Sequence, residues 1–183
     1  MVNHPASPAP WIVRFAPLVE AGAPVLDLAC GKGRHVRLFL GRGHPVTAVD
    51  VDVSGLAELE GWPGLEIVQA DLEDGAPWPL GGRRFGAVVV TNYLWRPLLP
   101  MILEAVGPRG VLLYETFAQG NEALGRPSNP DFLLRPGELL DLVRGKLQVV
   151  AYEHGRLEHP RSAIKQRICA IRDDRPTSLC LEA

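Results

Sequence analysis

The stretch that decides the fold is VLDLACGKGRH, residues 25–35. Its first half is apolar enough for a buried strand, its two glycines suit a tight turn, and the residues after the turn begin a helix. A second apolar run, PVTAV at residues 45–49, follows and ends on Asp50. A strand, a glycine turn, a helix and a second strand that ends in an acid form half of a nucleotide-binding α/β unit.

The turn and the acid indicate which kind of ligand this unit binds. Gly31 and Gly33 have no Cβ, so the backbone can come within contact distance of a ligand there. Asp50 can accept two hydrogen bonds from a ribose diol, which predicts an adenosine-containing cofactor. Dinucleotide-binding enzymes carry a further glycine in the next turn of the chain, but this sequence has Val36 at that place.

The arrangement Asp-Leu-Ala-Cys-Gly-Lys-Gly at residues 27–33 resembles motif I of class I S-adenosylmethionine (SAM) dependent methyltransferases. The resemblance implies that Asp27 and the glycine turn hold the amino-acid end of SAM, and that Asp50 holds its ribose. One departure from the family pattern is Ala29, which stands where many members carry the first glycine.

Two further segments extend this resemblance. LEIVQADLE, residues 65–73, is typical of a third strand, and the resemblance implies that Asp71 approaches the exocyclic amine of adenine. FGAVVVTNYL, residues 85–94, is typical of a fourth strand that enters the active-site loop. The cofactor-binding residues that we expect are Asp27, Ala29, Gly31, Gly33, Asp50, Val51, Asp71, Leu72 and Asn92.

The second half of the chain completes the predicted sheet. Strands are predicted over residues 110–114, 147–152 and 164–171, and helices over 97–106 and 136–144. The polar loop over 153–162 is too short for a crossover helix, so the last two strands should form an antiparallel hairpin. We expect an α/β, Rossmann-like, seven-stranded, mostly parallel sheet with one antiparallel strand and helices on both faces.

The length of 183 residues, 46% of them hydrophobic, suits one well-cored domain. We expect residues 1–183 to form a single SAM-dependent methyltransferase domain, with loosely ordered tails at about 1–10 and 173–183. Between the first tail and the first strand, apolar residues recur at helical spacing over 11–21. That helix either closes over the cofactor pocket or packs on the edge of the sheet.

Composition argues against several kinds of partner. The formal net charge is −2, so no basic field indicates nucleic acid. No apolar run approaches membrane-spanning length. Cys30, Cys169 and Cys180 show no Cys-x-x-Cys or Cys/His metal spacing, which is typical of reduced thiols in a cytoplasmic protein.

The histidines predict no metal site. His154 and His159 lie near Glu153 and Glu158 in the predicted polar loop, but their spacing matches no compact ligand motif. His35 follows the glycine turn directly, and we expect it near the cofactor carboxylate or in solvent.

The loop after the fourth strand supplies the first candidate catalytic residue. Methyl transfer from a sulfonium mainly requires the nucleophile to be held near the methyl carbon with water excluded. Residues 91–97 lack the Asn/Asp-Pro-Pro-Tyr/Phe quartet of enzymes that methylate planar amino groups of bases and glutamine. Tyr93 can line the methyl channel; the alternative is that Tyr93 and Trp95 pack against the following helix.

Glu115 and Arg126 complete the predicted catalytic set. They lie in a long segment, residues 115–131, that is rich in Gly, Pro and Asn and of the kind that forms lids or substrate walls. The two side chains can form an ion pair, or Arg126 can bind an anionic substrate; an ordinary solvated loop is the alternative. YETF at 114–117, with the downstream NPDFLLRPGEL at 129–139, resembles small bacterial tellurite-resistance-like methyltransferases.

The sequence therefore predicts methyl transfer from SAM to a small-molecule nucleophile, such as a thiol or a chalcogen oxyanion, by in-line displacement. One alternative is a non-catalytic SAM-binding partner or sensor module. A nicotinamide oxidoreductase is a second alternative, which Val36 and Asp71 disfavour. The identity of the acceptor, the oligomeric state and the pathway are not predicted.

Overall fold

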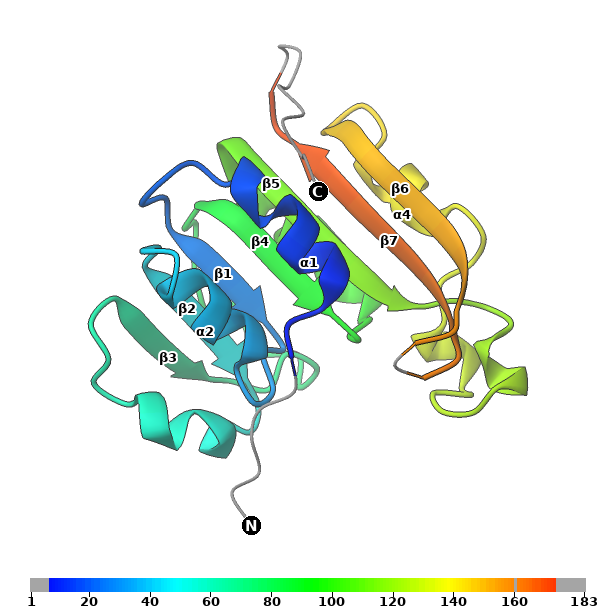
Figure 1. The fold of residues 1–183 in the computed structure, drawn as a ribbon, viewed down its shortest axis with the longest axis horizontal. Helices are drawn as coiled ribbons and strands as arrows, with labels where there is room; N and C mark the ends of the chain where they lie inside the picture. Colours follow the sequence, from blue (N-terminus) through cyan, green and yellow to red (C-terminus); the bar gives the residue numbers. More distant parts are fainter. Residues whose placement is uncertain (1–6, 160, 174–183) are drawn as a thin grey trace.

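A seven-stranded sheet forms the centre of the computed structural model, which describes residues 7–159 and 161–173 (Figure 1). Its strand order is β3-β2-β1-β4-β5-β7-β6. The strands are β1 (Val25–Leu28), β2 (Val46–Asp50), β3 (Leu65–Gln69), β4 (Phe85–Thr91), β5 (Val106–Phe117), β6 (Gln148–Leu157) and β7 (Ala163–Ile171). Among these strands only β7 is reversed, pairing antiparallel with β5 and with β6. The predicted Rossmann-like sheet with one antiparallel strand is confirmed.

Helices cover both faces of the sheet. One face carries α1 (Pro10–Phe15), which continues into η1 (Ala16–Leu18), and α2 (Arg34–Leu40); α4 (Glu138–Val143) lies behind the sheet (Figure 1). The other elements are α3 (Leu99–Ala105) and the short 3₁₀ helices η2 (Ser54–Leu59), η3 (Arg96–Leu98), η4 (Asn121–Ala123) and η5 (Pro130–Phe132). Two hydrophobic clusters result, one on each face.

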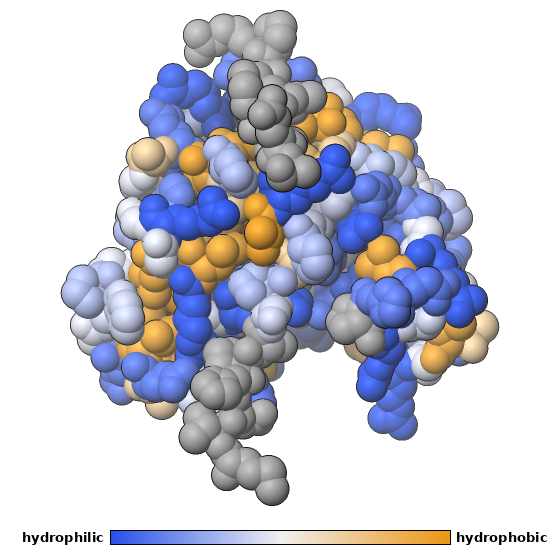
Figure 2. Space-filling model, in the orientation of Figure 1, coloured by the Kyte–Doolittle hydropathy of each residue, from blue (hydrophilic) through white to orange (hydrophobic). Residues whose placement is uncertain are grey.

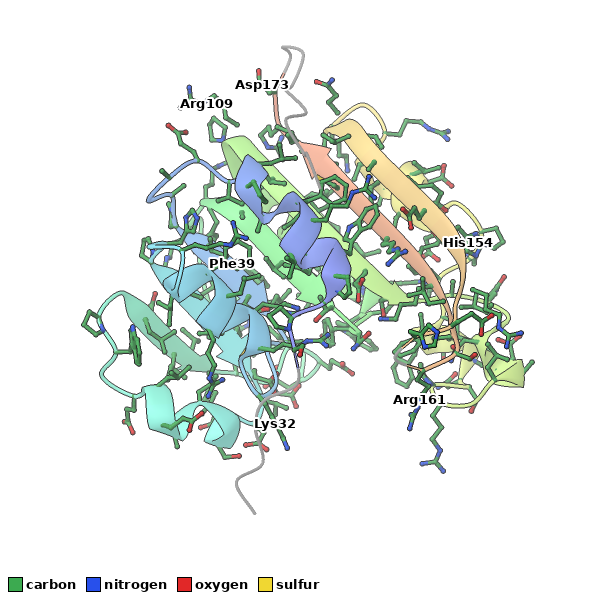
Figure 3. The ribbon with its side chains drawn as sticks, in the orientation of Figure 1. Lys32, Phe39, Arg109, His154, Arg161 and Asp173 are labelled. Atoms are coloured by element: carbon green, nitrogen blue, oxygen red, sulfur yellow. The ribbon has the colours of Figure 1, made fainter. Side chains whose placement is uncertain are left out.

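The central strands are apolar because both of their faces are covered. Every residue of β1 is buried, and β1 lies in register with both neighbours: Leu28 is opposite Val49 of β2 and Val90 of β4. The parallel strands therefore end together at one edge of the sheet. Lys32, in the glycine turn, marks this edge in Figure 3.

The first helix packs on the sheet. Trp11 donates its indole N–H to the carbonyl of Ile168 in β7 at 3.2 Å, and Ile12 and Phe15 are fully buried. Hydrophobic residues gather around α1 and α2 on this face, whereas the β6–β7 hairpin beside them is mostly hydrophilic (Figure 2). The helix therefore lies on a face of the sheet, over β5 and β7, and both alternatives for it, covering the cofactor pocket and packing on the sheet edge, are wrong.

The β6–β7 hairpin is longer than its polar sequence predicts. β6 continues to Leu157, so the first half of the predicted loop is strand. Arg167 of β7 lies opposite Glu153 and donates to its carboxylate at 2.9 Å. Opposite charges on facing strands stabilise such a pair. A strand prediction based on hydrophobicity alone therefore ends β6 too early.

The predicted tails fall largely outside the described residues, at 1–6 and 174–183. Ala9, within the first predicted tail, is buried and donates its N–H to His35 at 3.1 Å. In the part of the chain that the structure describes, no helix has the length and apolar character needed to cross a membrane.

Candidate functional site

The glycine turn between β1 and α2 uses its two glycines for different purposes. Gly31 has φ +53°, and a Cβ placed there would meet no heavy atom within 4 Å. Gly33 has φ +70°, and its Cβ would lie 2.3 Å from the Leu56 side chain. Gly31 therefore leaves open space beside the turn, whereas Gly33 lets η2 pack against it. Ala29 also adopts a positive φ, +52°, a conformation that costs a non-glycine residue about 1 kcal/mol.

Asp50, at the end of β2, is held against this turn. Its Oδ2 accepts the Gly31 N–H at 2.7 Å, and its Oδ1 accepts the Asp52 N–H at 3.0 Å. Each carboxylate oxygen can accept more than one hydrogen bond. The half-buried side chain is therefore fixed in position and retains capacity to bind a ligand diol.

A first cleft opens beside Asp50, and we call it the nucleoside cleft. It has a volume of about 210 Å³. Its lining residues are Ala29, Asp50, Val51, Ala70, Asp71, Leu72, Glu73 and Tyr93. Val51 is 58% exposed although it is apolar, and Leu72 is half-buried, so both offer apolar surface to a flat base. Carboxylates beside apolar walls, with open space at Gly31, fit the adenosine and methionine parts of SAM.

Asp71 lies on the rim of the nucleoside cleft. It is exposed, and its Oδ1 accepts the N–H of Glu73 at 2.9 Å. This bond closes a short turn after β3, and Glu73 in that turn also lines the cleft. Asp71 is thus placed where a carboxylate can accept a hydrogen bond from an exocyclic amine.

A second cleft of about 250 Å³ adjoins the first, and we call it the acceptor cleft. Its lining residues are Glu73, Asn92, Tyr93, Leu94, Thr116, Phe117, Pro127 and Phe132. Glu73 and Tyr93 line both clefts and so stand at their junction. Asn92 lines this second cleft, although the sequence analysis placed it among the cofactor-binding residues.

Tyr93 is fixed at this junction through its backbone. Its carbonyl accepts the hydroxyl of the fully buried Tyr114 at 2.9 Å. Its own hydroxyl oxygen is buried and makes no hydrogen bond within the described residues. Burial raises the pKa of Tyr93 above its ordinary value, and the negative charge of nearby Glu73 raises it further. Tyr93 is therefore a neutral phenol at physiological pH.

Glu115 is not paired as the sequence analysis expected. Its Oε1 lies 3.0 Å from Nζ of Lys165, which also donates to Oδ1 of Asn92 at 2.7 Å. Both Glu115 and Lys165 are almost completely buried, whereas Arg126 is exposed. The expected Glu115–Arg126 ion pair is wrong. Neither Glu115 nor Arg126 lines the acceptor cleft; Lys165 was missed because only the pairing of β5 with β7 brings it to Glu115.

Asp27 and His35 lie beneath the glycine turn. Each is 1% exposed, and His35 Nδ1 is 4.0 Å from Asp27 Oδ1, while Asp27 Oδ2 has no hydrogen-bond partner within the described residues. Burial raises the pKa of Asp27 to about 7 and lowers that of His35 to about 3. The placement of His35 in solvent is wrong because its side chain is buried, whereas its placement near the cofactor carboxylate stays a prediction. Asp27 lies outside the residues that line the nucleoside cleft.

Arg96, which sequence reasoning missed, fixes one wall of the acceptor cleft. It donates to the Glu138 carboxylate and to the backbone carbonyls of Asp131 and Leu133. Phe132 lies between those two carbonyls and lines the cleft. The loop after β4 therefore holds the segment that follows β5.

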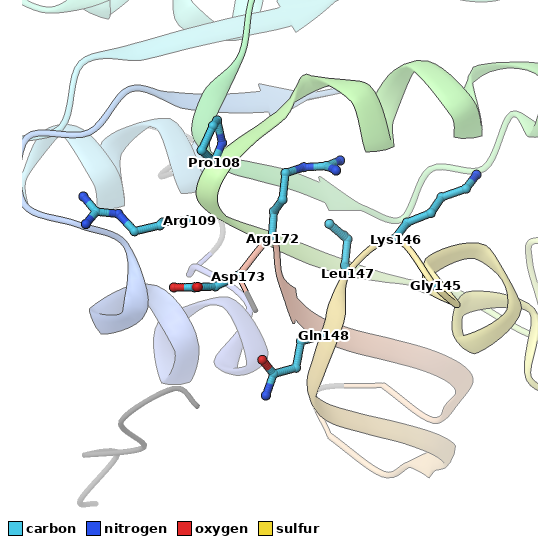
Figure 4. A pocket seen from close by; sticks show the side chains of 8 residues that line it. All are labelled: Pro108, Arg109, Gly145, Lys146, Leu147, Gln148, Arg172 and Asp173. Carbon is cyan, nitrogen blue, oxygen red and sulfur yellow. The ribbon is translucent and has the colours of Figure 1, made fainter. Parts of the chain in front are cut away.

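A further pocket of about 370 Å³ lies at the opposite edge of the sheet. Its basic residues do not converge on a common point: the side chains of Arg109 and Lys146 extend in opposite directions (Figure 4). Arg109 pairs with Glu20, and Arg172 donates to the backbone carbonyls of Val106 and Leu103. No group of His, Cys, Asp or Glu within residues 7–159 and 161–173 could hold a metal ion.

Comparison with known proteins agrees with this geometry. Residues 25–107 match the model of a family described as a methyltransferase domain. TehB from Haemophilus influenzae superposes with a TM-score of 0.74 at 16% identity, over 94% of this chain and 64% of TehB. This chain thus spans slightly less than two thirds of TehB. A search of the curated proteins found no significant match.

Two further crystal structures are similar at low identity. The 1,6-didemethyltoxoflavin-N1-methyltransferase of Burkholderia thailandensis, with S-adenosylhomocysteine bound, gives a TM-score of 0.64 at 21% identity, over 90% of this chain and 76% of its own. The glycopeptide N-methyltransferase MtfA, complexed with S-adenosylhomocysteine, gives a TM-score of 0.61 at 23% identity. The superposition covers 91% of this chain and 90% of MtfA. At these identities the likeness establishes the fold.

The fold is the one shared with these SAM-dependent methyltransferases, and the site lies at the edge of the sheet where the parallel strands end. Residues 25–107, a little under half of the chain, are similar to the methyltransferase-domain family, and two of the similar structures hold S-adenosylhomocysteine.

Proposed function

We propose that this protein transfers the methyl group of SAM to a small-molecule nucleophile. The observation that carries the proposal is the pair of adjoining clefts, which share Glu73 and Tyr93. A methyl donor in one cleft and a nucleophile in the other would meet at that junction. An acceptor cleft of about 250 Å³ suits a small molecule.

The residues of the nucleoside cleft would hold the cofactor. Asp50 accepts the ribose hydroxyls, Asp71 faces the adenine amine, and Val51 and Leu72 enclose the base. Gly31 leaves room for the methionine part. The cofactor, when bound, supplies a methyl group already activated by the positive charge on sulfur.

The residues of the acceptor cleft would position the nucleophile and exclude water. Tyr93 separates the two clefts with its ring and presents a neutral hydroxyl. Phe117 and Phe132 form apolar walls that keep water from the reacting atoms. Glu115 acts indirectly, because it holds Lys165 and thereby Asn92. This arrangement favours catalysis by proximity and orientation.

Calorimetric titration with SAM, S-adenosylhomocysteine and NAD is the first test. We expect the first two to bind and NAD not to bind. Incubation with SAM and a panel of thiols, chalcogen oxyanions and amines, followed by mass spectrometry, then identifies methylated products. SAM binding with no product from any acceptor would favour the non-catalytic SAM-binding module.

We further propose that residues 1–183 act as one domain in the cytoplasm. A single sheet contains all seven strands of the described residues. The two described cysteines, Cys30 and Cys169, are buried free thiols, and Cys180 lies outside the described residues. Subcellular fractionation followed by immunodetection checks the location.

A further inference from the structure

Negative charge predominates at the junction of the two clefts. Glu73 is the one charged side chain among the described residues that line the acceptor cleft. Asp50 and Asp71 add two carboxylates along the adjoining nucleoside cleft. An anionic acceptor placed between these groups would be repelled, whereas a cationic acceptor would be attracted.

Three cations near the acceptor cleft are bound to other groups, whereas Arg126, next to the lining residue Pro127, is exposed. Lys165 is 11% exposed and bonds to Glu115 and Asn92. Arg96 is bound to Glu138. Arg34 donates to Thr91 Oγ1 at 3.4 Å. These groups therefore offer little free positive charge to a substrate.

Aromatic and apolar side chains form the remainder of the acceptor cleft. Tyr93, Phe117 and Phe132 contribute three rings, and Phe132 is 41% exposed although it is apolar. Rings at such positions stack on flat apolar molecules, and their faces also attract cations.

We propose that the methyl acceptor is an amine carried on a flat apolar body, bound with its nitrogen beside Glu73 and its body among Tyr93, Phe117 and Phe132. This inference rests on the proposed function and selects one acceptor class within it. The acceptor binds beside Glu73 as an ammonium and first loses one proton to water. The nitrogen lone pair freed in this way forms the bond to the methyl carbon. The carbon–sulfur bond breaks and its electron pair goes to sulfur. The methylated product is an ammonium that keeps its two remaining protons, so the single proton released is the one given to the water around the exposed Glu73.

Two probes with the same ring and opposite charge test the proposal: phenethylamine and phenylacetate. Each is titrated into the protein in the presence of S-adenosylhomocysteine, and binding is followed by NMR chemical shifts. We expect the amine to bind about tenfold more tightly, a ratio equivalent to about 1.4 kcal/mol. Glu73→Gln should reduce the ratio to about threefold or less.

Glu104→Gln is the matched control, because it makes the same charge change at an exposed position of α3 outside both clefts. It should keep the tenfold ratio. An unchanged ratio in Glu73→Gln overturns the proposal, as does equal binding of the two probes or binding of neither. Tighter binding of phenylacetate that is lost in Arg126→Gln would also overturn it and assign the cleft to an anion held by Arg126.

The acceptor panel separates this inference from the proposed function. If an oxyanion or a thiol is methylated and no amine is, the proposed methyltransferase activity is supported and the proposal of an amine acceptor is overturned. SAM binding without any product would count against the methyltransferase itself. The probe ratios are measured without turnover, so they remain a separate readout.

Discussion

The Arg96 guanidinium binds both carboxylate oxygens of Glu138, with Nε 2.8 Å from Oε1 and Nη2 3.0 Å from Oε2. Glu138 is 8% exposed and begins α4, and Arg96 begins η3 after β4. Burial alone would raise the pKa of Glu138, but the hydrogen bonds from Arg96 and Arg135 hold it below its ordinary value. This pair joins two segments that border the acceptor cleft.

Replacing Arg96 should loosen that wall. Arg96→Gln leaves the buried Glu138 carboxylate without its main partner, which should cost about 1–3 kcal/mol of unfolding free energy. Urea unfolding measures this loss, and limited proteolysis should cut residues 118–137 faster, while the SAM dissociation constant stays within about twofold. Arg135→Gln is the control, because Arg135 is 69% exposed and lies 3.5 Å from Glu138. Equal effects of the two variants would contradict this role of Arg96.

The buried Asp27 and His35 should have opposite effects on the pH dependence of stability. The pKa of Asp27 is raised to about 7, so its contribution to stability is lost as pH rises from about 4 to 7. The pKa of His35 is lowered to about 3, so its contribution is lost as pH falls from about 6.5 to 3. In the wild-type protein the two contributions to the slope of unfolding free energy against pH largely cancel between about pH 4 and 6.5.

Single substitutions should reveal each slope. Relative to wild type, unfolding free energy should rise with pH in Asp27→Asn and fall with pH in His35→Gln, by up to about 1.4 kcal/mol per pH unit. Urea unfolding at several values between pH 4.5 and 6.5 checks this. Arg34, Asp50 and Lys165 also act on these two groups, so each profile is compared with that of wild type. Parallel profiles for all three proteins would show that neither group titrates as described.

Sequence patterns predicted the sheet because each central strand is a continuous apolar run, and the carboxyl ends of parallel strands meet at one edge. The same reasoning, with the family resemblance, put Asp50, Asp71 and Tyr93 near that edge, and their roles stay predictions. Side-chain partners on neighbouring strands could not be predicted from such patterns. Lys165 lies fifty residues from Glu115 in the sequence and reaches it only because β7 runs antiparallel to β5. Glu73 was passed over because an exposed acid after a strand has no distinctive pattern.

Burial was also hard to predict near the glycine turn. A histidine and an acid close to a cofactor motif suggest direct contact with the ligand. The backbone at the start of α2 instead turns His35 inward, where Ala9 donates to it. No local pattern encodes that contact, because Ala9 and His35 are 26 residues apart.

Asp50 should contribute strongly to cofactor affinity. Asp50→Ala removes the carboxylate from the nucleoside cleft, and a lost charge-assisted hydrogen bond costs about 1.5–3 kcal/mol. SAM binding should therefore weaken by about tenfold to a hundredfold in calorimetry. Asp52→Asn is the control, because Asp52 is exposed and its carboxylate accepts the Ser54 N–H. A folded Asp50→Ala protein with wild-type affinity would remove Asp50 from the binding site.

Alanine at each of the two turn glycines should separate binding from stability. At Gly31 a Cβ meets no protein atom but occupies the space assigned to the cofactor, so Gly31→Ala should weaken SAM binding at least tenfold and cost about 1 kcal/mol from its positive φ. At Gly33 the Cβ would clash with Leu56, so Gly33→Ala should cost more stability, about 2–4 kcal/mol, with a smaller change in affinity. Calorimetry and urea unfolding measure both quantities. If Gly31→Ala binds SAM as wild type does, the open space beside the turn is not part of the cofactor site.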